Sequence, residues 1–143
     1  MNSIQKNTYE WDKVNDDPVR PELSLAWRLS VGNIYYTGEM DDPGAVCCTS
    51  KCWIIPDSTR DLVVENGGNV LVAYTVWSYK PRAGRDLVFE LRDFAMADPM
   101  TDRLVTLSPK TKMARRFHLN NGAVLLKENK HTDNYEYDIN GEK

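Results

Sequence analysis

The stretch from Val70 to Tyr79 constrains the fold of this chain more than any other. Its residues are mostly β-branched or aromatic with little polar interruption, a composition typical of a strand buried on both faces. Lys80-Pro81 breaks the run, and helix and strand patterns alternate from there to the end of the chain. The sequence therefore predicts a mixed α/β fold in which helices pack on a sheet.

The first pattern after this strand is helical. Apolar residues from Asp86 to Ala97 recur at i, i+1, i+4, i+7 and i+8, and Pro99 follows as a stop. A shorter strand through Leu87-Val88-Phe89 is the alternative. Leu104 to Leu107 is a short apolar run that indicates a second buried strand.

Ser108-Pro109 predicts the start of another helix, because Ser is a good N-cap and Pro at the first helical position loses no hydrogen bond. This helix would run from Lys110 to Leu119 and end at Asn120-Asn121-Gly122, where Gly can take the left-handed conformation. We expect two more strands after it, at Ala123–Leu126 and Tyr135–Ile139, joined as a hairpin.

The first half of the chain gives weaker signals. Residues 1–19 are polar, and we expect a flexible arm that Tyr9 and Trp11 pin to the body. Pro21 at a first helical position favours a helix from Glu22 to Tyr36, with a strand through Leu29–Tyr36 as the alternative.

Ala45 to Ile55 is apolar and prone to form a strand, and Thr59 to Glu65 predicts a short helix capped by Asp57-Ser58. A chain of 143 residues is long enough for one domain with its own core. We therefore expect residues 20–143 to form a single domain.

The C-terminal half, roughly Gly68 to Ile139, resembles the GNAT acyltransferase family. The closing motif of that family has an Asn at a helix start, an Ala three residues on, a Tyr seven on, and Gly-Ala or Gly-Phe after about eleven. Ala114, Phe117 and Gly122-Ala123 match this motif, whereas Thr111 and His118 stand in the Asn and Tyr positions. The chain is also similar to small GNAT-like proteins of tailed phages, some of which are carried inside the virion.

The resemblance implies a GNAT-like mixed sheet whose central parallel strands, at about 70–79 and 103–107, diverge to admit a CoA thioester. Backbone N–H groups at Thr75, Val76 and Trp77 would hold the thioester carbonyl. The loop Arg82-Ala83-Gly84-Arg85 would take the pyrophosphate, and Ser108, Lys110 and Thr111 would lie near the pantetheine and phosphates.

The phosphate loop departs from the family pattern, because it has one Gly where two are usual. A Gly-containing loop before a helix N-terminus is an anion site on general grounds, and two flanking Arg residues can bind phosphate directly. Without the resemblance, the same residues describe an ordinary connection between a strand and a helix.

His118 is the candidate catalytic residue. It stands where GNAT enzymes keep the Tyr that protonates the departing CoA thiolate, and a His titrates near neutral pH. The alternative is a structural His that interacts with the C-terminal end of its helix. No carboxylate lies in Val70–Trp77, so no general base is apparent there, and this absence also fits a catalytically silent protein.

The basic helix around Lys110–His118 has two further interpretations, a solvated surface or a nucleic-acid contact. The net charge of −3 argues against nucleic acid as a partner. Cys47, Cys48 and Cys52 are an odd number with no fourth ligand nearby, so we expect neither a disulfide framework nor a metal site.

No stretch is long and apolar enough for a membrane span or a signal peptide. We therefore expect a cytoplasmic protein, in the host cytoplasm if the chain is phage-encoded, with packaging in the virion as the alternative.

Together these observations predict an acyl-CoA-dependent N-acyltransferase that transfers acetyl from acetyl-CoA to an amine. The alternative is a catalytically inactive GNAT-like phage protein that acts in the virion or through a protein partner.

Overall fold

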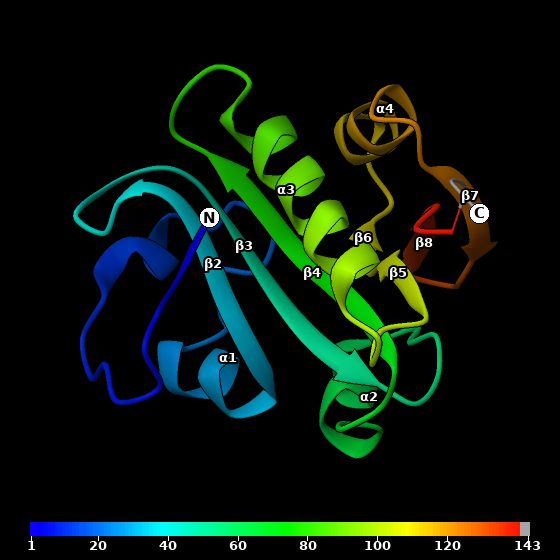
Figure 1. The fold of residues 1–143 in the computed structure, drawn as a ribbon, viewed down its shortest axis with the longest axis horizontal. Coiled ribbons are helices and arrows are strands. Elements are labelled where there is room, and N and C mark those ends of the chain that lie inside the picture. The colour runs from blue at the N-terminus through cyan, green and yellow to red at the C-terminus, as the bar shows by residue number, and fades with distance from the viewer. Residues whose placement is uncertain (141–143) are drawn as a thin grey trace.

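A computed structural model describes residues 1–140 of the chain. The fold is one open, mixed sheet with helices on both faces (Figure 1). The strands follow the order β1-β2-β3-β4-β5-β8-β6, and β7 pairs with β8 off this path. The last three residues of the domain expected over 20–143 lie outside the described part.

The strands and helices have the following bounds. The strands are β1 (Asn2–Ser3), β2 (Gly32–Glu39), β3 (Asp42–Cys52), β4 (Val70–Ser78), β5 (Arg103–Thr106), β6 (Ser108–Pro109), β7 (Val124–Glu128) and β8 (Thr132–Tyr137). The helices are the 3-10 helix η1 (Asp12–Asp16), α1 (Leu25–Val31), α2 (Thr59–Val64), α3 (Ala83–Ala97) and α4 (Lys112–Asn120).

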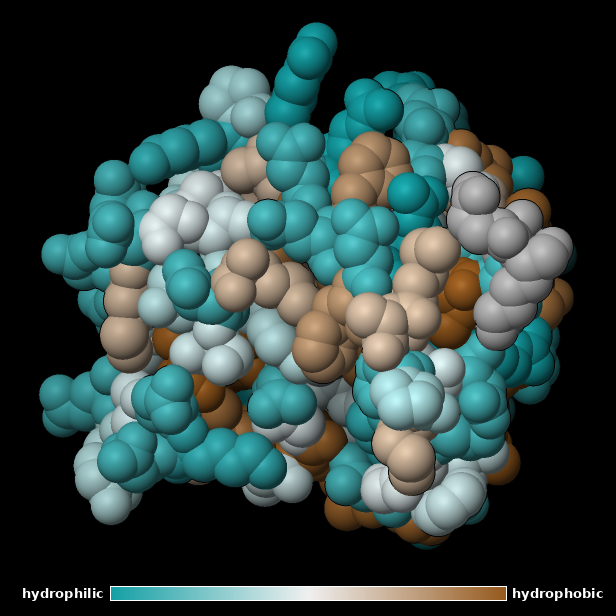
Figure 2. All heavy atoms as spheres, in the orientation of Figure 1, coloured by the Kyte–Doolittle hydropathy of each residue, from teal (hydrophilic) through white to brown (hydrophobic). Residues whose placement is uncertain are grey.

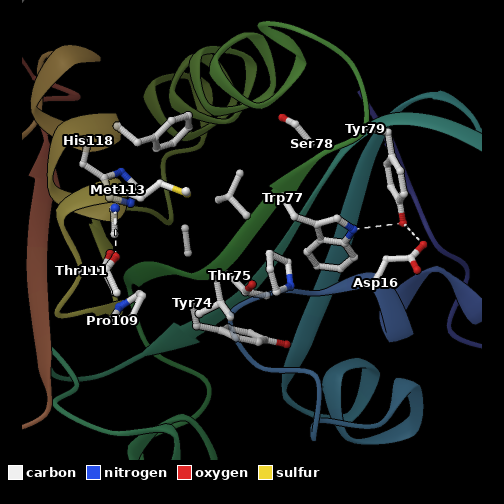
Figure 3. A pocket seen from close by; sticks show the side chains of 17 residues that line it. Asp16, Tyr74, Thr75, Trp77, Ser78, Tyr79, Pro109, Thr111, Met113 and His118 are labelled. Atoms are coloured by element: carbon white, nitrogen blue, oxygen red, sulfur yellow. Dashed lines mark hydrogen bonds between the residues drawn. The ribbon is translucent and has the colours of Figure 1, made fainter.

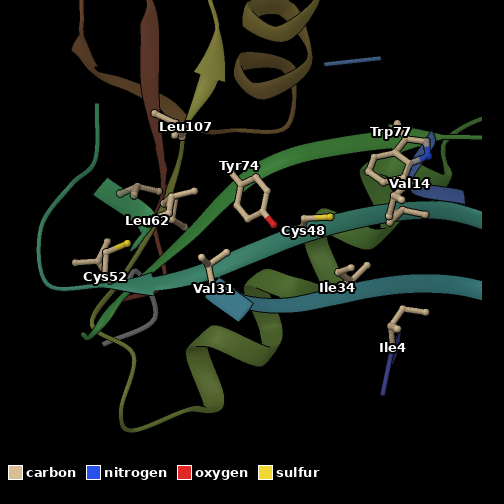
Figure 4. Close-up of a cluster of buried hydrophobic side chains, with 14 of the residues drawn as sticks. Ile4, Val14, Val31, Ile34, Cys48, Cys52, Leu62, Tyr74, Trp77 and Leu107 are labelled. Carbon is tan, nitrogen blue, oxygen red and sulfur yellow. The ribbon is translucent and has the colours of Figure 1, made fainter. Parts of the chain in front are cut away.

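Side chains of the central strands alternate between two hydrophobic cores, as the period of two in a strand requires. Val46 and Cys48 of β3 point into one core, to which α1 and α2 contribute Val31 and Leu62. Figure 4 shows Cys48 in this core beside Tyr74. Ala45 and Cys47 point into the other, which α3 covers with a buried stripe that includes Leu87 and Leu91. Burial on both faces explains why β4 is a nearly continuous apolar run.

The pairing of β4 changes at Tyr74. Its N-terminal part pairs with β5 in parallel register, from Val70 opposite Arg103 to Ala73 opposite Thr106. On the other side, β3 pairs with β4 throughout, but the register shifts so that Tyr74 is an extra residue between Ala73 and Thr75. A bulge of this kind bends its strand and increases its twist, so β4 and β5 diverge beyond this point.

Several predicted elements are confirmed. The long strand at Val70–Tyr79 is β4, the helix at Asp86–Ala97 is most of α3, and the short helix at Thr59–Glu65 is α2. The strand after residue 103 is β5, and it lies parallel to β4 as the resemblance implied. The closing hairpin is β7 with β8.

The helix start predicted at Ser108-Pro109 is wrong, as is the one at Glu22 described below. Ser108-Pro109 does not begin a helix but forms β6, which pairs with Asp133 and Thr132 of β8. The helix begins at Lys112, where the hydroxyl of Thr111 accepts a hydrogen bond from the N–H of Ala114. A Pro is tolerated in so short a strand at the sheet's edge because it lacks only a donor.

The region predicted as a helix over Glu22–Tyr36 contains both alternatives. Residues 25–31 are α1, with Ser24 rather than Glu22 at its start, and residues from Gly32 on form β2. A Cβ at Gly32 would lie 1.9 Å from the carbonyl oxygen of Thr49, so only Gly lets β2 approach β3 where the helix ends.

The N-terminal segment packs on the sheet. β1 pairs with β2, and Ile4 and Val14 are buried in the first core. Trp11 pins the segment, since its indole N–H donates to the carbonyl of Met40 at 2.9 Å, whereas Tyr9 is 91% exposed. The segment thereby brings residues 16–20 to the opening between β4 and β5.

Candidate cofactor pocket

A pocket of about 440 Å³ occupies the opening where β4 and β5 diverge (Figure 3). Three segments line it: the diverging half of β4, the turn and helix from Ser108 to His118, and the N-terminal segment around Asp16–Val19. Its lining is largely apolar, with a few polar groups at its two ends. Such a cleft is the usual form of a site for a small molecule or cofactor.

The β4 wall is an unpaired strand edge. Residues Tyr74 to Ser78 line the pocket, and β5 pairs with β4 only as far as Ala73. β3 occupies the opposite edge of the same residues. Beyond the Tyr74 carbonyl, which accepts from Arg20 Nε, main-chain groups on the pocket side have no neighbouring strand and are available to an extended ligand, much as an exposed strand edge accepts a peptide.

The opposite wall is α4. Thr111, Met113, Phe117 and His118 line the pocket from this helix, and Met113 is 81% exposed. The N-cap at Thr111 fixes where the helix begins and therefore which residues face β4.

His118 is buried at the inner side of this wall. Its Nδ1 lies 2.7 Å from the hydroxyl of Tyr137, and its ring stacks on Tyr135 with the centroids 5.1 Å apart. Burial lowers the pKa of His118 to about 4, because the charged imidazolium is poorly solvated there. The ring is therefore neutral near pH 7, and it lines the pocket as a hydrogen-bonding group rather than a cation.

The N-terminus of α3 lies beside Ser78, the last β4 residue of the pocket wall. Arg82 precedes the helix in a left-handed conformation (φ 64°). Gly84 packs closely there, since a Cβ would lie 2.5 Å from the Ser78 hydroxyl and 3.7 Å from the Phe117 ring. This close approach brings the first turn of α3, with the N–H groups of Gly84 and Arg85, near both walls.

The N-terminal segment around Asp16 forms the third wall. It takes part in a hydrogen-bonded chain at the end of the pocket away from His118. The Trp77 indole N–H donates to the Tyr79 hydroxyl at 3.1 Å, and that hydroxyl donates to Asp16 at 2.6 Å. Partial burial and the bond to Asp16 raise the pKa of Tyr79 to about 12. Asp16 is the only carboxylate among the lining residues that the structure describes.

A buried ion pair supports this wall from behind. The side chains of Asp17 and Arg28 are fully buried, with 2.7 Å between Oδ2 and Nη1. Asp17 Oδ1 also accepts from the Thr75 hydroxyl at 2.8 Å, so the N-terminal segment is tied to β4 at the point where β4 turns away. Buried charges are tolerated when they are paired and hydrogen-bonded in this way.

Half of the predicted cofactor residues lie on the pocket. Thr75, Val76, Trp77, Ser108 and Thr111 line it, as does His118. Arg82, Ala83, Gly84 and Arg85 form the adjoining N-terminus of α3 without lining it. Lys110 points to β8 and pairs with Asp133 at 2.5 Å.

Sequence reasoning did not identify the wall formed by Asp16, Pro18 and Val19, nor the role of Tyr79. These residues lie in a polar segment with no motif. The one signal in the sequence for this wall is Trp11, because its burial holds the segment against the sheet.

Over residues 1–140, no group of His, Cys, Asp and Glu side chains is arranged to hold a metal ion. None of the helices there has the length and hydropathy needed to cross a bilayer.

No protein-family model matches the sequence, and no curated protein sequence matches it either. Solved structures do match. The GNAT-like decarboxylase GphF in complex with isobutyryl-CoA superposes with a TM-score of 0.73 at 12% identity, over 96% of this chain and 98% of that one.

Two other solved structures also superpose on this chain. The loading GNATL domain of CurA from Lyngbya majuscula gives a TM-score of 0.62 at 11% identity, over 76% and 77% of the two chains. A probable acetyltransferase from Staphylococcus epidermidis ATCC 12228 gives 0.53 at 16% identity, over 91% and 82%. With its parallel strands diverging around a pocket, this chain therefore has the fold of the GNAT superfamily.

Proposed function

We propose that this protein is an acyl-CoA-dependent N-acyltransferase that transfers acetyl from acetyl-CoA to an amine. The observation that carries the proposal is the pocket between the unpaired edge of β4 and α4. An extended pantetheine arm has amide groups that can pair with such an edge, and its thioester would then lie between β4 and His118. The GNAT-like decarboxylase GphF, of the same fold, was solved with isobutyryl-CoA, which supports a CoA derivative as the ligand.

The phosphates of the cofactor would lie at the N-terminus of α3. Free N–H groups and the helix dipole favour an anion there. Arg82 and Arg85 are exposed beside this turn, and Arg115 and Arg116 are exposed on α4. Figure 2 shows mostly hydrophilic side chains over the upper part of this face, where α3 begins in Figure 1. Positive charge around the pocket mouth fits a polyanionic cofactor.

His118 would act on the leaving sulfur. With a pKa of about 4, its imidazole is neutral at physiological pH. When the Tyr137 hydroxyl donates to Nδ1, the proton of the neutral ring is on Nε2. His118 then stabilises the developing thiolate as a hydrogen-bond donor, which is a smaller contribution than proton transfer from an imidazolium.

Asp16 and Tyr79 would serve the acceptor amine. They lie at the end of the pocket away from His118, and their carboxylate and hydroxyl face one another at 2.6 Å (Figure 3). A carboxylate attracts an ammonium group and can take its proton through a water molecule before attack on the thioester.

The test combines binding with turnover. Acetyl-CoA at millimolar concentration is expected to raise the melting temperature, because a ligand that binds only the native state stabilises it. Acetyl transfer to a panel of small amines is then followed by CoA release. His118→Phe should reduce turnover while the affinity for acetyl-CoA changes little. If acetyl-CoA produces no thermal shift, the enzyme proposal fails.

Decarboxylation of a carboxyacyl-CoA is a second candidate, favoured by the match to the decarboxylase GphF over nearly the whole chain. An apolar pocket with a neutral His118 suits this reaction, because desolvation destabilises a substrate carboxylate and hydrogen bonds stabilise the enolate left after CO₂ departs. Release of CO₂ from malonyl-CoA without an amine would support this candidate, and amine-dependent CoA release from acetyl-CoA would support the first.

The remaining alternative is a catalytically inactive, phage-encoded protein that is packaged in the virion or binds a protein partner there. The single Gly in the phosphate loop supports it. An active phage enzyme would work in the host cytoplasm. Recovery of the chain from purified phage particles, together with no turnover of any thioester, would favour the inactive form.

A further inference from the structure

The hydrogen-bond ladder between β4 and β5 ends at one specific rung. Its last main-chain bond runs from the N–H of Leu107 to the carbonyl of Ala73 at 3.0 Å. In an uninterrupted parallel ladder, the carbonyl of Leu107 would next accept from the N–H of Thr75. It accepts instead from Nη2 of Arg20 at 3.0 Å.

The same guanidinium also contacts the other strand. Arg20 Nε donates to the carbonyl of Tyr74, the bulged residue of β4, at 3.1 Å. One rigid, planar group therefore bridges the carbonyls of two strands at the point where they separate. Because the nitrogens of a guanidinium are fixed relative to one another, the bridge also fixes the spacing between the strands.

The backbone of Arg20 is itself held by buried groups. Its N–H donates to Asp17 Oδ1 at 3.1 Å, and its carbonyl accepts from Arg28 Nη2 at 2.7 Å. The Asp17–Arg28 pair is fully buried, so it gives Arg20 a fixed base. Among the described residues, no other side chain donates to both strands at this point.

We propose that Arg20 is a positioning residue that ends the β4–β5 ladder and keeps the edge of β4 open to a thioester ligand. The inference rests on the proposed use of this pocket for acyl-CoA. It adds that the opening depends on a side chain from the N-terminal segment as well as on the bulge at Tyr74. A Lys cannot replace Arg20, because its single ammonium group does not span both carbonyls in a fixed geometry.

The experiment compares Arg20→Ala and Arg20→Lys with the native protein and with Arg60→Ala, which removes an exposed arginine on α2. Urea unfolding first establishes that each variant is folded. Amide hydrogen exchange without ligand then reports on the opening, and calorimetry measures the affinity for acetyl-CoA.

We expect both Arg20 variants to bind acetyl-CoA about tenfold or more weakly, since each loses hydrogen bonds from a charged donor. Amides at Tyr74–Trp77 should change their exchange rates relative to the amides of α3, and Arg60→Ala should match the native protein in both measurements. Guanidinium ion at a few millimolar should partly restore binding by Arg20→Ala, whereas ammonium ion should not.

Native affinity and native local exchange in Arg20→Lys would overturn the proposal. If Arg20→Ala fails to fold, Arg20→Lys alone decides, because it keeps the aliphatic stem and the charge. If the native protein binds no acetyl-CoA but the exchange at Tyr74–Trp77 still depends on Arg20, the acyl-CoA function fails and the positioning role stands.

Discussion

The two side walls of the pocket are built in different ways. The α4 wall depends on short-range features: an N-cap at Thr111, an apolar stripe through Phe117, and a Gly at residue 122 with positive φ just after the helix. The N-terminal wall depends on long-range contacts, since Asp17 is 58 residues away from its partner Thr75. A wall of the first kind can be predicted from its own sequence, and a wall of the second kind cannot.

The two walls also differ in how much they contribute to the free energy of unfolding. The N-terminal wall contains a buried ion pair, whose loss leaves a charge without a partner in an apolar environment. The α4 wall presents exposed charged residues and one buried neutral ring. We therefore expect changes in the N-terminal wall to affect the free energy of unfolding most, and changes in α4 to affect the site locally.

The largest effect should come from Asp17→Ala. The substitution leaves the buried guanidinium of Arg28 unpaired and removes the acceptor of the Thr75 hydroxyl. We expect the free energy of unfolding to fall by about 3–5 kcal/mol, measured by urea denaturation.

The matched control is Asp42→Ala, which breaks an exposed pair with Lys80 and should cost less than about 1 kcal/mol. Equal losses for the two variants would show that the N-terminal wall is not held by the buried pair.

A smaller effect is the pH dependence that His118 gives to the free energy of unfolding. Because burial lowers the pKa of His118 to about 4 in the folded protein, the unfolded chain binds the proton more readily. The free energy of unfolding therefore has its full value above the unfolded pKa of about 6.5. It falls by up to roughly 3 kcal/mol as the pH falls toward 4.

Urea unfolding from pH 7 to pH 4 measures this dependence. His118→Gln should show a flatter profile than the native protein, and the exposed His131→Gln should retain the native profile. A native slope in His118→Gln would mean that this histidine does not titrate between the two states.

The smallest effect is expected at the N-cap of α4. Thr111→Ala removes the acceptor of the Ala114 N–H, and we expect a loss of about 1 kcal/mol, with Thr111→Ser close to native. Thermal unfolding by circular dichroism measures the loss. A loss as large as that of Asp17→Ala would contradict the contrast between the two walls.

The sequence was sufficient for the central strands β4 and β5 and for one side of the candidate site. The apolar run at Val70–Tyr79 and the helical spacing of α3 identify the core, because burial dictates both patterns. The motif from Thr111 to Gly122 located α4 and placed His118 on the pocket. Ser108-Pro109 was misread because Pro suits an edge strand as well as a helix start, and the pairing with β8 decides between them.

The other side of the site was beyond sequence reasoning for a physical reason. Asp16 and Tyr79 meet only after β4 and the N-terminal segment fold together, and neither lies in a periodic pattern. Arg20 likewise gains its role only from two carbonyls that the bulge at Tyr74 exposes. Contacts of this kind follow from tertiary packing, which local propensities do not encode.

Binding of acetyl-CoA between β4 and α4 can be followed by a titration monitored through backbone amide chemical shifts. We expect saturable shifts at Thr75–Ser78 and Gly84–Arg85, and unchanged amides in α2. The absence of shifts at millimolar acetyl-CoA, or shifts confined to residues away from the β4–α4 pocket, would contradict the proposed site.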